Sequence, residues 1–320
     1  MDLTETNTFG QPQLKPSSLP AGRPSHRWNR PWMTVKERIR DIKKMVCFSQ
    51  DQISRKADCK KPISCQNDEG EQDRLDRQHN MCVILLDGNL GLAPVRSPKY
   101  VLDIATGTGI WATQFAERNP ESNVLGTDLT GNQRKPHVSN VSFLQHDAEG
   151  EAWNFPNKFD YIHMRYVVPC FDNLQGVIKN AFDSMNPGGW IEFLDSPLEI
   201  LTVDDTVRGT GLEHFATAVE ESSAKLGRDL LKPKHYASWL REAGFVNVVE
   251  KIIPVPGNPW SKDPKQKVLG GFMLHDMKVT IGSMHKFYNI FGYSKLETEK
   301  IIAETQSALE DTNIHFYWNK

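Results

Sequence analysis

Long apolar segments are missing from this 320-residue chain, and their absence limits the classes of protein to which it can belong. There is no apolar N-terminal stretch of the kind that forms a signal peptide. There is also no run of about 18 apolar residues that could cross a membrane. The sequence therefore predicts no membrane contact, and we expect a cytoplasmic location, with the nucleus as the alternative.

Cysteine is scarce, and its spacing excludes two further classes. The chain has an odd number of cysteines and no C-x-x-C pair; they are Cys47, Cys59, Cys65, Cys82 and Cys170. This pattern matches neither a disulfide framework nor a zinc ligand set. We expect free thiols in a reducing compartment and no bound metal.

A strong net charge is also missing, although the charge is unevenly distributed. The formal net charge is −2, yet residues 1–67 contain 13 Lys and Arg against 6 Asp and Glu, so the rest of the chain is acidic. A basic, proline-containing leader predicts a disordered basic N-terminal arm over 1–67. The acidic body over 68–320 argues against direct nucleic-acid binding by the folded domain.

From residue 68 onward, short apolar runs alternate with amphipathic helical patterns. Asp68 and Glu71 resemble a capping box that opens a helix. The runs predicted as strands are 100–104, 123–128, 141–145, 159–164, 190–195, 245–255 and 314–318. This alternation predicts an α/β domain with a mainly parallel sheet covered on both faces.

Two stretches, at about 198–233 and 256–311, interrupt the alternation with helical patterns. In the first, Leu212, Phe215 and Val219 recur at helical spacing and need a partner surface, which the second could provide. Both stretches follow predicted strands, so they can fold back over the carboxyl edge of the sheet. We expect them to form a helical lid over a ligand site.

The turn after the first predicted strand carries the clearest chemical signal. From Asp103 it reads DIATGTGIWA, so Gly107 and Gly109 stand where backbone must pass close to a ligand. This pattern also fits the dinucleotide fingerprint G-x-G-x-x-G/A. Asp103 favours S-adenosylmethionine (SAM) over a dinucleotide, because its carboxylate would repel a pyrophosphate but attract the ammonium group of SAM.

Acidic residues follow the next two predicted strands. Asp128 is placed to accept hydrogen bonds from ribose hydroxyls, a role shared by NAD and SAM sites. Asp147 has no counterpart in the dinucleotide fingerprint; in methyltransferases an acid there accepts from the adenine amino group, and the Ala148 amide contacts the ring. The full set expected to bind the cofactor is Asp103, Ala105, Gly107, Gly109, Asp128, Leu129, Asp147 and Ala148.

These segments in this order resemble class I, Rossmann-like methyltransferases, and 67–76, 107–111 and 258–260 look like the fungal LaeA-like methyltransferases. The resemblance covers roughly 67–318. It implies a Rossmann-like sheet with an antiparallel last strand, SAM as cofactor and a link with fungal secondary metabolism.

His163, at the end of the fourth predicted strand, is the candidate catalytic base, and Arg165 lies beside it. Asp195 is a second candidate for orienting an acceptor, with a turn cap before Pro197 as its structural alternative. A base is needed only if the acceptor arrives protonated.

Three functions remain in contention on the sequence. The leading one is methylation of a small-molecule or peptide-derived natural product. The second is a LaeA-type nuclear regulator that acts through protein partners. An NAD-dependent oxidoreductase is the third, and it depends only on the glycine pattern.

Overall fold

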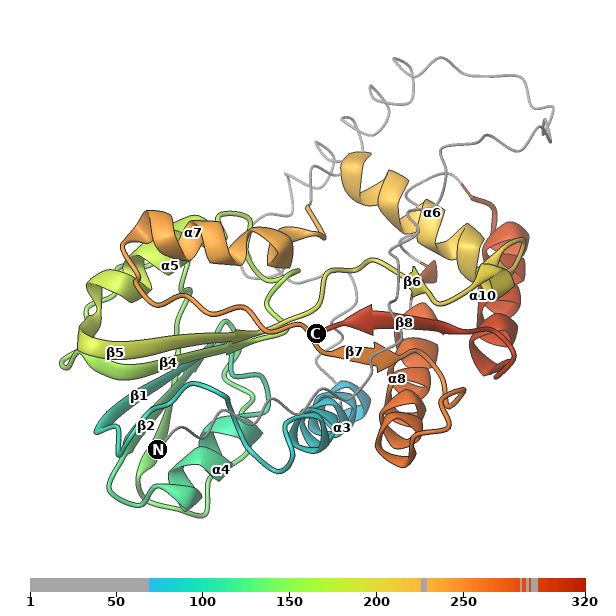
Figure 1. The fold of residues 1–320 in the computed structure, drawn as a ribbon. Coiled ribbons are helices and arrows are strands. Elements are labelled where there is room, and N and C mark those ends of the chain that lie inside the picture. The colour runs from blue at the N-terminus through green and yellow to red at the C-terminus, as the bar shows by residue number, and fades with distance from the viewer. Residues whose placement is uncertain (1–68, 226–228, 283, 286–287, 289–292) are drawn as a thin grey trace, which may run out of the picture.

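The computed structural model describes residues 69–225, 229–282, 284, 285, 288 and 293–320 (Figure 1). The predicted basic arm, 1–67, lies outside these residues. The described chain forms two adjoining parts, called here the sheet layer and the lid layer. The sheet layer is a parallel sheet with its covering helices, and the lid layer is a group of helices around a small second sheet (Figure 1).

The sheet layer contains five parallel strands in the order β3-β2-β1-β4-β5, which confirms the predicted fold class. Their bounds are β1 (Tyr100–Ile104), β2 (Asn123–Asp128), β3 (Val141–Gln145), β4 (Phe159–Arg165) and β5 (Met185–Leu194). Successive strands are added on one side of β1 and then on the other. The order therefore reverses between β1 and β4, where open α/β sheets bind their ligands.

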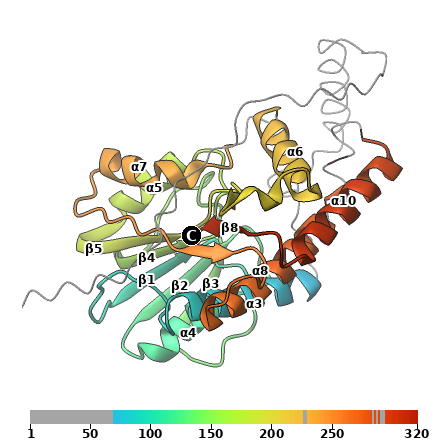
Figure 2. The ribbon, with the colours of Figure 1, turned by 45° about the vertical axis from the view of Figure 1, so that its right-hand side comes forward.

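Helices cover both faces of this sheet, as its two-sided apolar strands require. On one face, Trp111 and Phe115 of α4 (Ile110–Arg118) pack against Val101 of β1 and Val124 of β2. On the other face lie α5 (Leu174–Asp183) and α7 (Tyr236–Ala243) (Figure 2). The side chains of neighbouring residues in one strand therefore point to opposite faces of the sheet and pack in different apolar cores.

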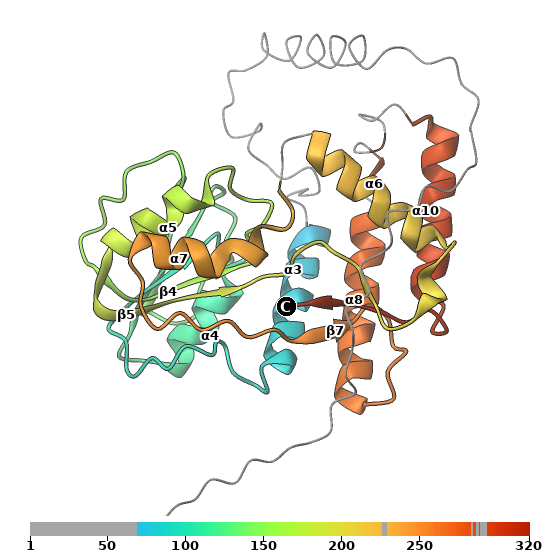
Figure 3. The same cartoon turned by 45° about the horizontal axis from the view of Figure 1, so that its top comes forward.

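The lid layer stands beside the carboxyl edge of the sheet (Figure 3). Its helices are α3 (Glu69–Leu85), α6 (Gly211–Lys225), α8 (Pro264–Gly282) and α10 (Lys295–Glu310). Its strands β6 (Leu201–Thr202), β8 (Phe316–Asn319) and β7 (Pro254–Pro256) form an antiparallel sheet in that order. Short 3-10 helices, η2 (Asp205–Val207) and η3 (Lys232–His235), lie between these elements.

One apolar core joins these distant segments. It contains Met81 of α3, Leu212 of α6, Met273 of α8, Ile302 of α10 and Trp318 of β8. The two predicted insertions therefore pack on each other and on α3. Gly211 permits a close approach of α6 to α10, because a Cβ there would lie 2.4 Å from the backbone carbonyl carbon of Glu304.

Three strands differ in extent or partner from the prediction. The strand predicted over 190–195 is β5, which already begins at Met185. The last strand is antiparallel, but its partners are β6 and β7 of the small sheet. The strand predicted over 245–255 forms only at Pro254–Pro256. Val246 and Val249 before it are 80% and 82% exposed, so the apolar pattern there does not mark a buried face.

Candidate functional site

A cavity of about 350 Å³ lies at the carboxyl edge of the sheet, between the ends of β1, β2 and β4 and the lid helices α3 and α8. Its wall includes Ala105 and Tyr166, which both have left-handed backbones with φ of 56°. Such a conformation costs a residue with a side chain about 1–3 kcal/mol and is typical of functional sites. The cavity therefore lies at the edge where the sequence predicts cofactor binding.

The glycine-rich turn after β1 places its two glycines differently. Gly107, with φ of 60°, borders the cavity, and its amide donates to Asp128 Oδ2 at 3.0 Å. Gly109 is the N-cap of α4, with φ of 79°, and a Cβ there would lie 2.4 Å from the Phe143 ring. The first glycine thus keeps space beside the cavity, and the second lets β3 approach the turn.

Asp128, at the end of β2, turns its carboxylate toward this turn. Oδ1 accepts hydrogen bonds from the Thr130 amide and hydroxyl, both at 3.0 Å. Burial raises the pKa of Asp128, and these hydrogen bonds oppose the rise. Leu129 follows in the cavity wall, so both residues of this predicted pair border the cavity.

Asp103 and His163 face each other across neighbouring strands. Asp103 Oδ1 lies 2.8 Å from His163 Nδ1, and the Thr106 hydroxyl donates to Asp103 Oδ2. The imidazole stacks on Trp111, with ring centroids 3.7 Å apart and planes within 1°. With Asp103 ionised, Nδ1 carries the proton and Nε2 is the basic nitrogen.

At the end of β3 the structure separates Asp147 from its neighbours. His146 and Ala148 border the cavity, whereas Asp147 is not among its lining residues. Asp147 Oδ1 accepts from the amides of Glu149 and Gly150, at 3.1 and 3.0 Å. Its carboxylate therefore stabilises the turn that follows the strand.

Arg165 ends β4 and reaches a histidine of the lid layer. Its Nη2 lies 3.1 Å from His79 Nδ1, and the other ring nitrogen of His79 bonds Gln114 Oε1 at 3.0 Å. Burial, together with the positive charge of Arg165, lowers the pKa of His79 to about 4. His79 is therefore neutral near pH 7 and accepts the hydrogen bond from Arg165.

Asp195, which follows β5, holds the loop after β4. Its carboxylate accepts from the amides of Val167 and Val168 at 2.9 and 3.1 Å, from Ser196, and from the Tyr236 hydroxyl at 3.0 Å. Burial raises the pKa of Asp195 to about 6, against the effect of these donors. Its contacts are those of a residue that positions the cavity wall.

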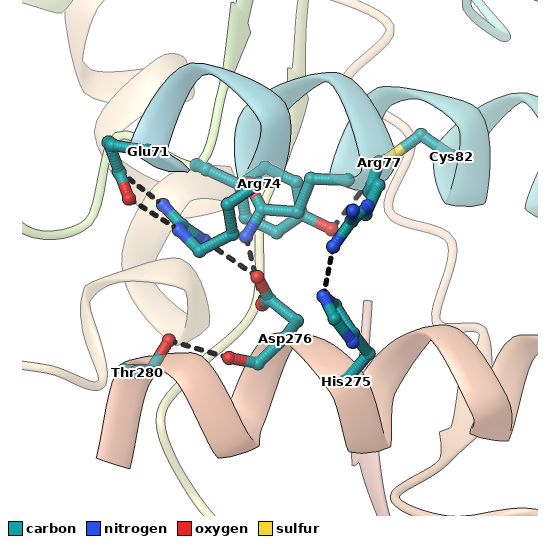
Figure 4. Close-up of polar contacts among 9 residues, drawn as sticks. Glu71, Arg74, Arg77, Cys82, His275, Asp276 and Thr280 are labelled. Carbon is teal, nitrogen blue, oxygen red and sulfur yellow. Dashed lines mark hydrogen bonds and ion pairs between the residues drawn. The ribbon is translucent and has the colours of Figure 1, made fainter. Parts of the chain in front are cut away.

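A polar cluster in the cavity wall joins α3 to α8 (Figure 4). Arg74 forms two hydrogen bonds to Glu71, at 2.7 and 2.8 Å, and an ion pair with Asp276 at 2.7 Å. Gln78 donates to the other oxygen of Asp276 at 3.0 Å. Sequence reasoning missed this pairing, because Arg74 and Asp276 are 202 positions apart and no local pattern connects them.

The part of the cavity under α8 has an apolar wall. Met273, Met277 and Trp318 line it, and Lys320 also borders the cavity. The Lys320 ammonium lies 4.5 Å from the ring centroid of Tyr166. These residues were not predicted either, since they become neighbours only through the lid core.

The chain matches the family model described as "Methyltransferase domain" over residues 77–250. It is 29% identical over 298 residues to "Probable methyltransferase tdiE" from Emericella nidulans, covering 91% of this chain and 92% of that protein. It is 26% identical over 255 residues to "Secondary metabolism regulator laeA" from Monascus pilosus, covering 78% of this chain and 70% of that protein.

Among solved structures, the chain resembles phosphoethanolamine N-methyltransferase 2 from Haemonchus contortus, with a TM-score of 0.43 and 19% identity. The match covers 75% of this chain and 50% of that one, so the chain spans about half the length of that protein. Within the described residues, no helix combines the length and the apolar composition needed to span a bilayer.

Proposed function

The chain belongs to the methyltransferase domain family and is a SAM-dependent methyltransferase, and from this premise we propose that it methylates a small-molecule or peptide-derived natural product in secondary metabolism. The observation that carries the proposal is one continuous cavity, whose lining includes both the carboxylates at the sheet edge and the apolar residues under α8. Donor and acceptor can therefore meet inside one space shielded by helices.

The side chains present fit SAM in the sheet half of the cavity. We assign the ribose hydroxyls to Asp128 and the ammonium group to Asp103, whose carboxylate has acceptor capacity beyond its two hydrogen bonds. Ala105 and Gly107 offer backbone beside the methionine part. Leu129 and Ala148 would contact the adenine.

Bound SAM supplies a methyl group that is already activated for displacement, so the chain must mainly align the acceptor with it. We propose His163 as the base for an acceptor that arrives protonated. Asp103 and Trp111 fix its ring, and His163 borders the cavity. The test is His163→Asn: a loss of kcat with unchanged SAM affinity supports the role, and an unchanged kcat contradicts it.

The position of the cavity between the sheet edge and two lid helices favours a compact acceptor. Helices α3 and α8 cover the sheet edge and are tied together by the Arg74–Asp276 ion pair. A cavity of this size between a sheet edge and two helices suits a small molecule better than a duplex or a folded protein surface. The methionine and tryptophan side chains under α8 suit an acceptor with an apolar body.

The deciding experiment incubates the protein with methyl-labelled SAM and fungal extract, then separates metabolite, protein and nucleic-acid fractions. We expect enzyme-dependent label in the metabolite fraction. Label confined to protein or nucleic acid would contradict the proposed acceptor class.

A second candidate function is regulation of the LaeA type, with a protein acceptor. The similarity to "Secondary metabolism regulator laeA" supports it. Enzyme-dependent label found only in protein in the same experiment would favour this candidate.

A further inference from the structure

The side chains that line the cavity carry more negative than positive charge. The lining includes five carboxylates and three Lys or Arg side chains, so with histidine counted as neutral the wall has a net charge of −2. Bound SAM brings one positive charge, because its ammonium and carboxylate charges cancel and its sulfonium charge remains. The loaded cavity therefore stays negative, and a negative cleft attracts a cationic ligand more strongly than an anionic one.

Four of these carboxylates are paired within the wall or assigned to the cofactor. Glu71 and Asp276 share the Arg74 guanidinium. Asp103 and Asp128 are the proposed contacts of SAM. Asp195 is the fifth, and it forms no ion pair with any residue that the structure describes. It is therefore the carboxylate that is left for a cationic acceptor.

Asp195 is buried, with 8% of its surface exposed, and its two carboxylate oxygens differ in their contacts. Oδ2 accepts from the amides of Val167 and Val168 and from the Tyr236 hydroxyl, so it holds the cavity wall. Oδ1 accepts only from the adjacent Ser196 amide, at 3.0 Å. A carboxylate oxygen can accept two hydrogen bonds, so Oδ1 has capacity for a donor from a ligand.

The negative charge of Asp195 is incompletely compensated by its surroundings. Burial raises the pKa of its carboxyl group to about 6, although the four neutral donors and the more distant charge of Lys320 act in the opposite direction. The Lys320 ammonium lies 4.5 Å from the centroid of the Tyr166 ring and forms no ion pair with Asp195. A cation bound beside Oδ1 would stabilise the ionised carboxylate.

The sheet order places Asp195 on the acceptor side of the cavity. The proposed cofactor contacts follow β1, β2 and β3, whereas Asp195 follows β5, on the other side of β1 and beyond β4. Val168, whose amide Asp195 holds, lines the cavity, as does Leu198. The Ser196 hydroxyl donates to the carbonyl of Asn319 at 2.7 Å, and the preceding residue, Trp318, lines the cavity too. Aromatic rings and carboxylates both attract an ammonium group.

We propose that Asp195 binds an ammonium group of the methyl acceptor, which makes the acceptor an apolar molecule with a basic amine. The proposal rests on the proposed function and specifies its substrate class. The ammonium group anchors the acceptor and need not be the group that is methylated. Ligands that share an apolar body and differ only in charge test this assignment.

The experiment uses protein loaded with S-adenosylhomocysteine (SAH) and measures calorimetric affinities for three probes. These are 1-naphthylmethylamine, which is a cation, 1-naphthylmethanol, which is neutral, and 1-naphthoate, which is an anion. Asp195→Asn removes the carboxylate charge, and Asp195→Ser is a second neutral variant in case the first does not fold. Tyr236→Phe is the matched control, because it removes one neutral donor to the same carboxylate and keeps the charge. SAH binding shows which variants are folded.

We expect the wild type and Tyr236→Phe to bind the amine about tenfold or more tighter than the alcohol, and the acid most weakly. The neutral variants of Asp195 should lose the preference for the amine. A wild type that binds the amine no better than the alcohol, or a preference that persists without the carboxylate, would overturn the proposal. The labelling experiment tests the proposed function separately, since label confined to protein or nucleic acid would contradict that function whichever probe binds best.

Discussion

The sheet layer and the lid layer build the two halves of one cavity in different ways. In the sheet layer, Asp103, Gly107 and Asp128 come from strand ends and an adjacent turn, so their order along the chain places them together. In the lid layer, Arg74 meets Asp276 across 202 positions. The comparison teaches that local sequence encodes the proposed cofactor half, whereas tertiary packing creates the proposed acceptor half.

The largest effect should come from filling the space beside the cavity in the sheet layer. Gly107→Val adds a branched side chain where φ is 60°, and we expect SAH binding to fall below detection in calorimetry. Gly188→Val is the matched control, because φ there is 83° and a Cβ would meet nothing within 4 Å. Equal losses in both variants would show that backbone strain, and not space beside the cavity, explains the result.

The lid layer should respond most strongly to loss of its buried ion pair. Arg74→Met leaves the buried Asp276 without its cation, and we expect a loss of about 3 kcal/mol in the free energy of unfolding. Arg77→Met removes the exposed contact with His275 and should cost less than about 1 kcal/mol. Urea unfolding measures both; similar small losses would mean that the pair does not tie α3 to α8.

Two buried groups should give the layers opposite pH responses. Asp195 has a folded pKa of about 6 against 3.8, so its contribution to stability is lost as pH rises through that window. His79 has a folded pKa of about 4 against 6.5, so its contribution is lost as pH falls through that window. Each effect amounts to about 3 kcal/mol.

The variants Asp195→Asn and His79→Gln separate these contributions. As pH rises from about 4 to about 6, the wild type should lose stability relative to Asp195→Asn. Over the same rise in pH it should gain stability relative to His79→Gln. Urea unfolding at several pH values gives both differences. If both differences in unfolding free energy changed with pH in the same direction, the opposite pKa shifts given for Asp195 and His79 would be refuted.

A smaller effect tests the proposed cofactor half itself. Asp128→Ala should weaken SAH binding by about 1–3 kcal/mol, because the ribose hydroxyls lose their acceptor. Asp147→Ala is the informative comparison, since Asp147 does not line the cavity and caps a turn. A larger loss at Asp147 than at Asp128 would restore the sequence-based role of Asp147 and contradict the geometry.

Much of the sheet layer was predictable because its signals are local. Apolar runs gave the five strands, and the glycine pattern gave the turn beside the cavity. For Asp147 the sequence predicts a cofactor contact that only a binding measurement tests, because a strand-end position does not fix the direction of a side chain. Arg74, Asp276 and Lys320 could not be predicted as neighbours, since the lid core that brings them together joins segments from both ends of the domain.

Hydrogen exchange with and without SAH tests the central claim most directly, namely that the cofactor binds at the sheet edge beneath the lid. The account predicts slower exchange of amides in 103–109 and 128–130 and in the middle of α8, and no such change with NAD. Protection confined to segments outside the cavity, or equal protection by NAD, would contradict it.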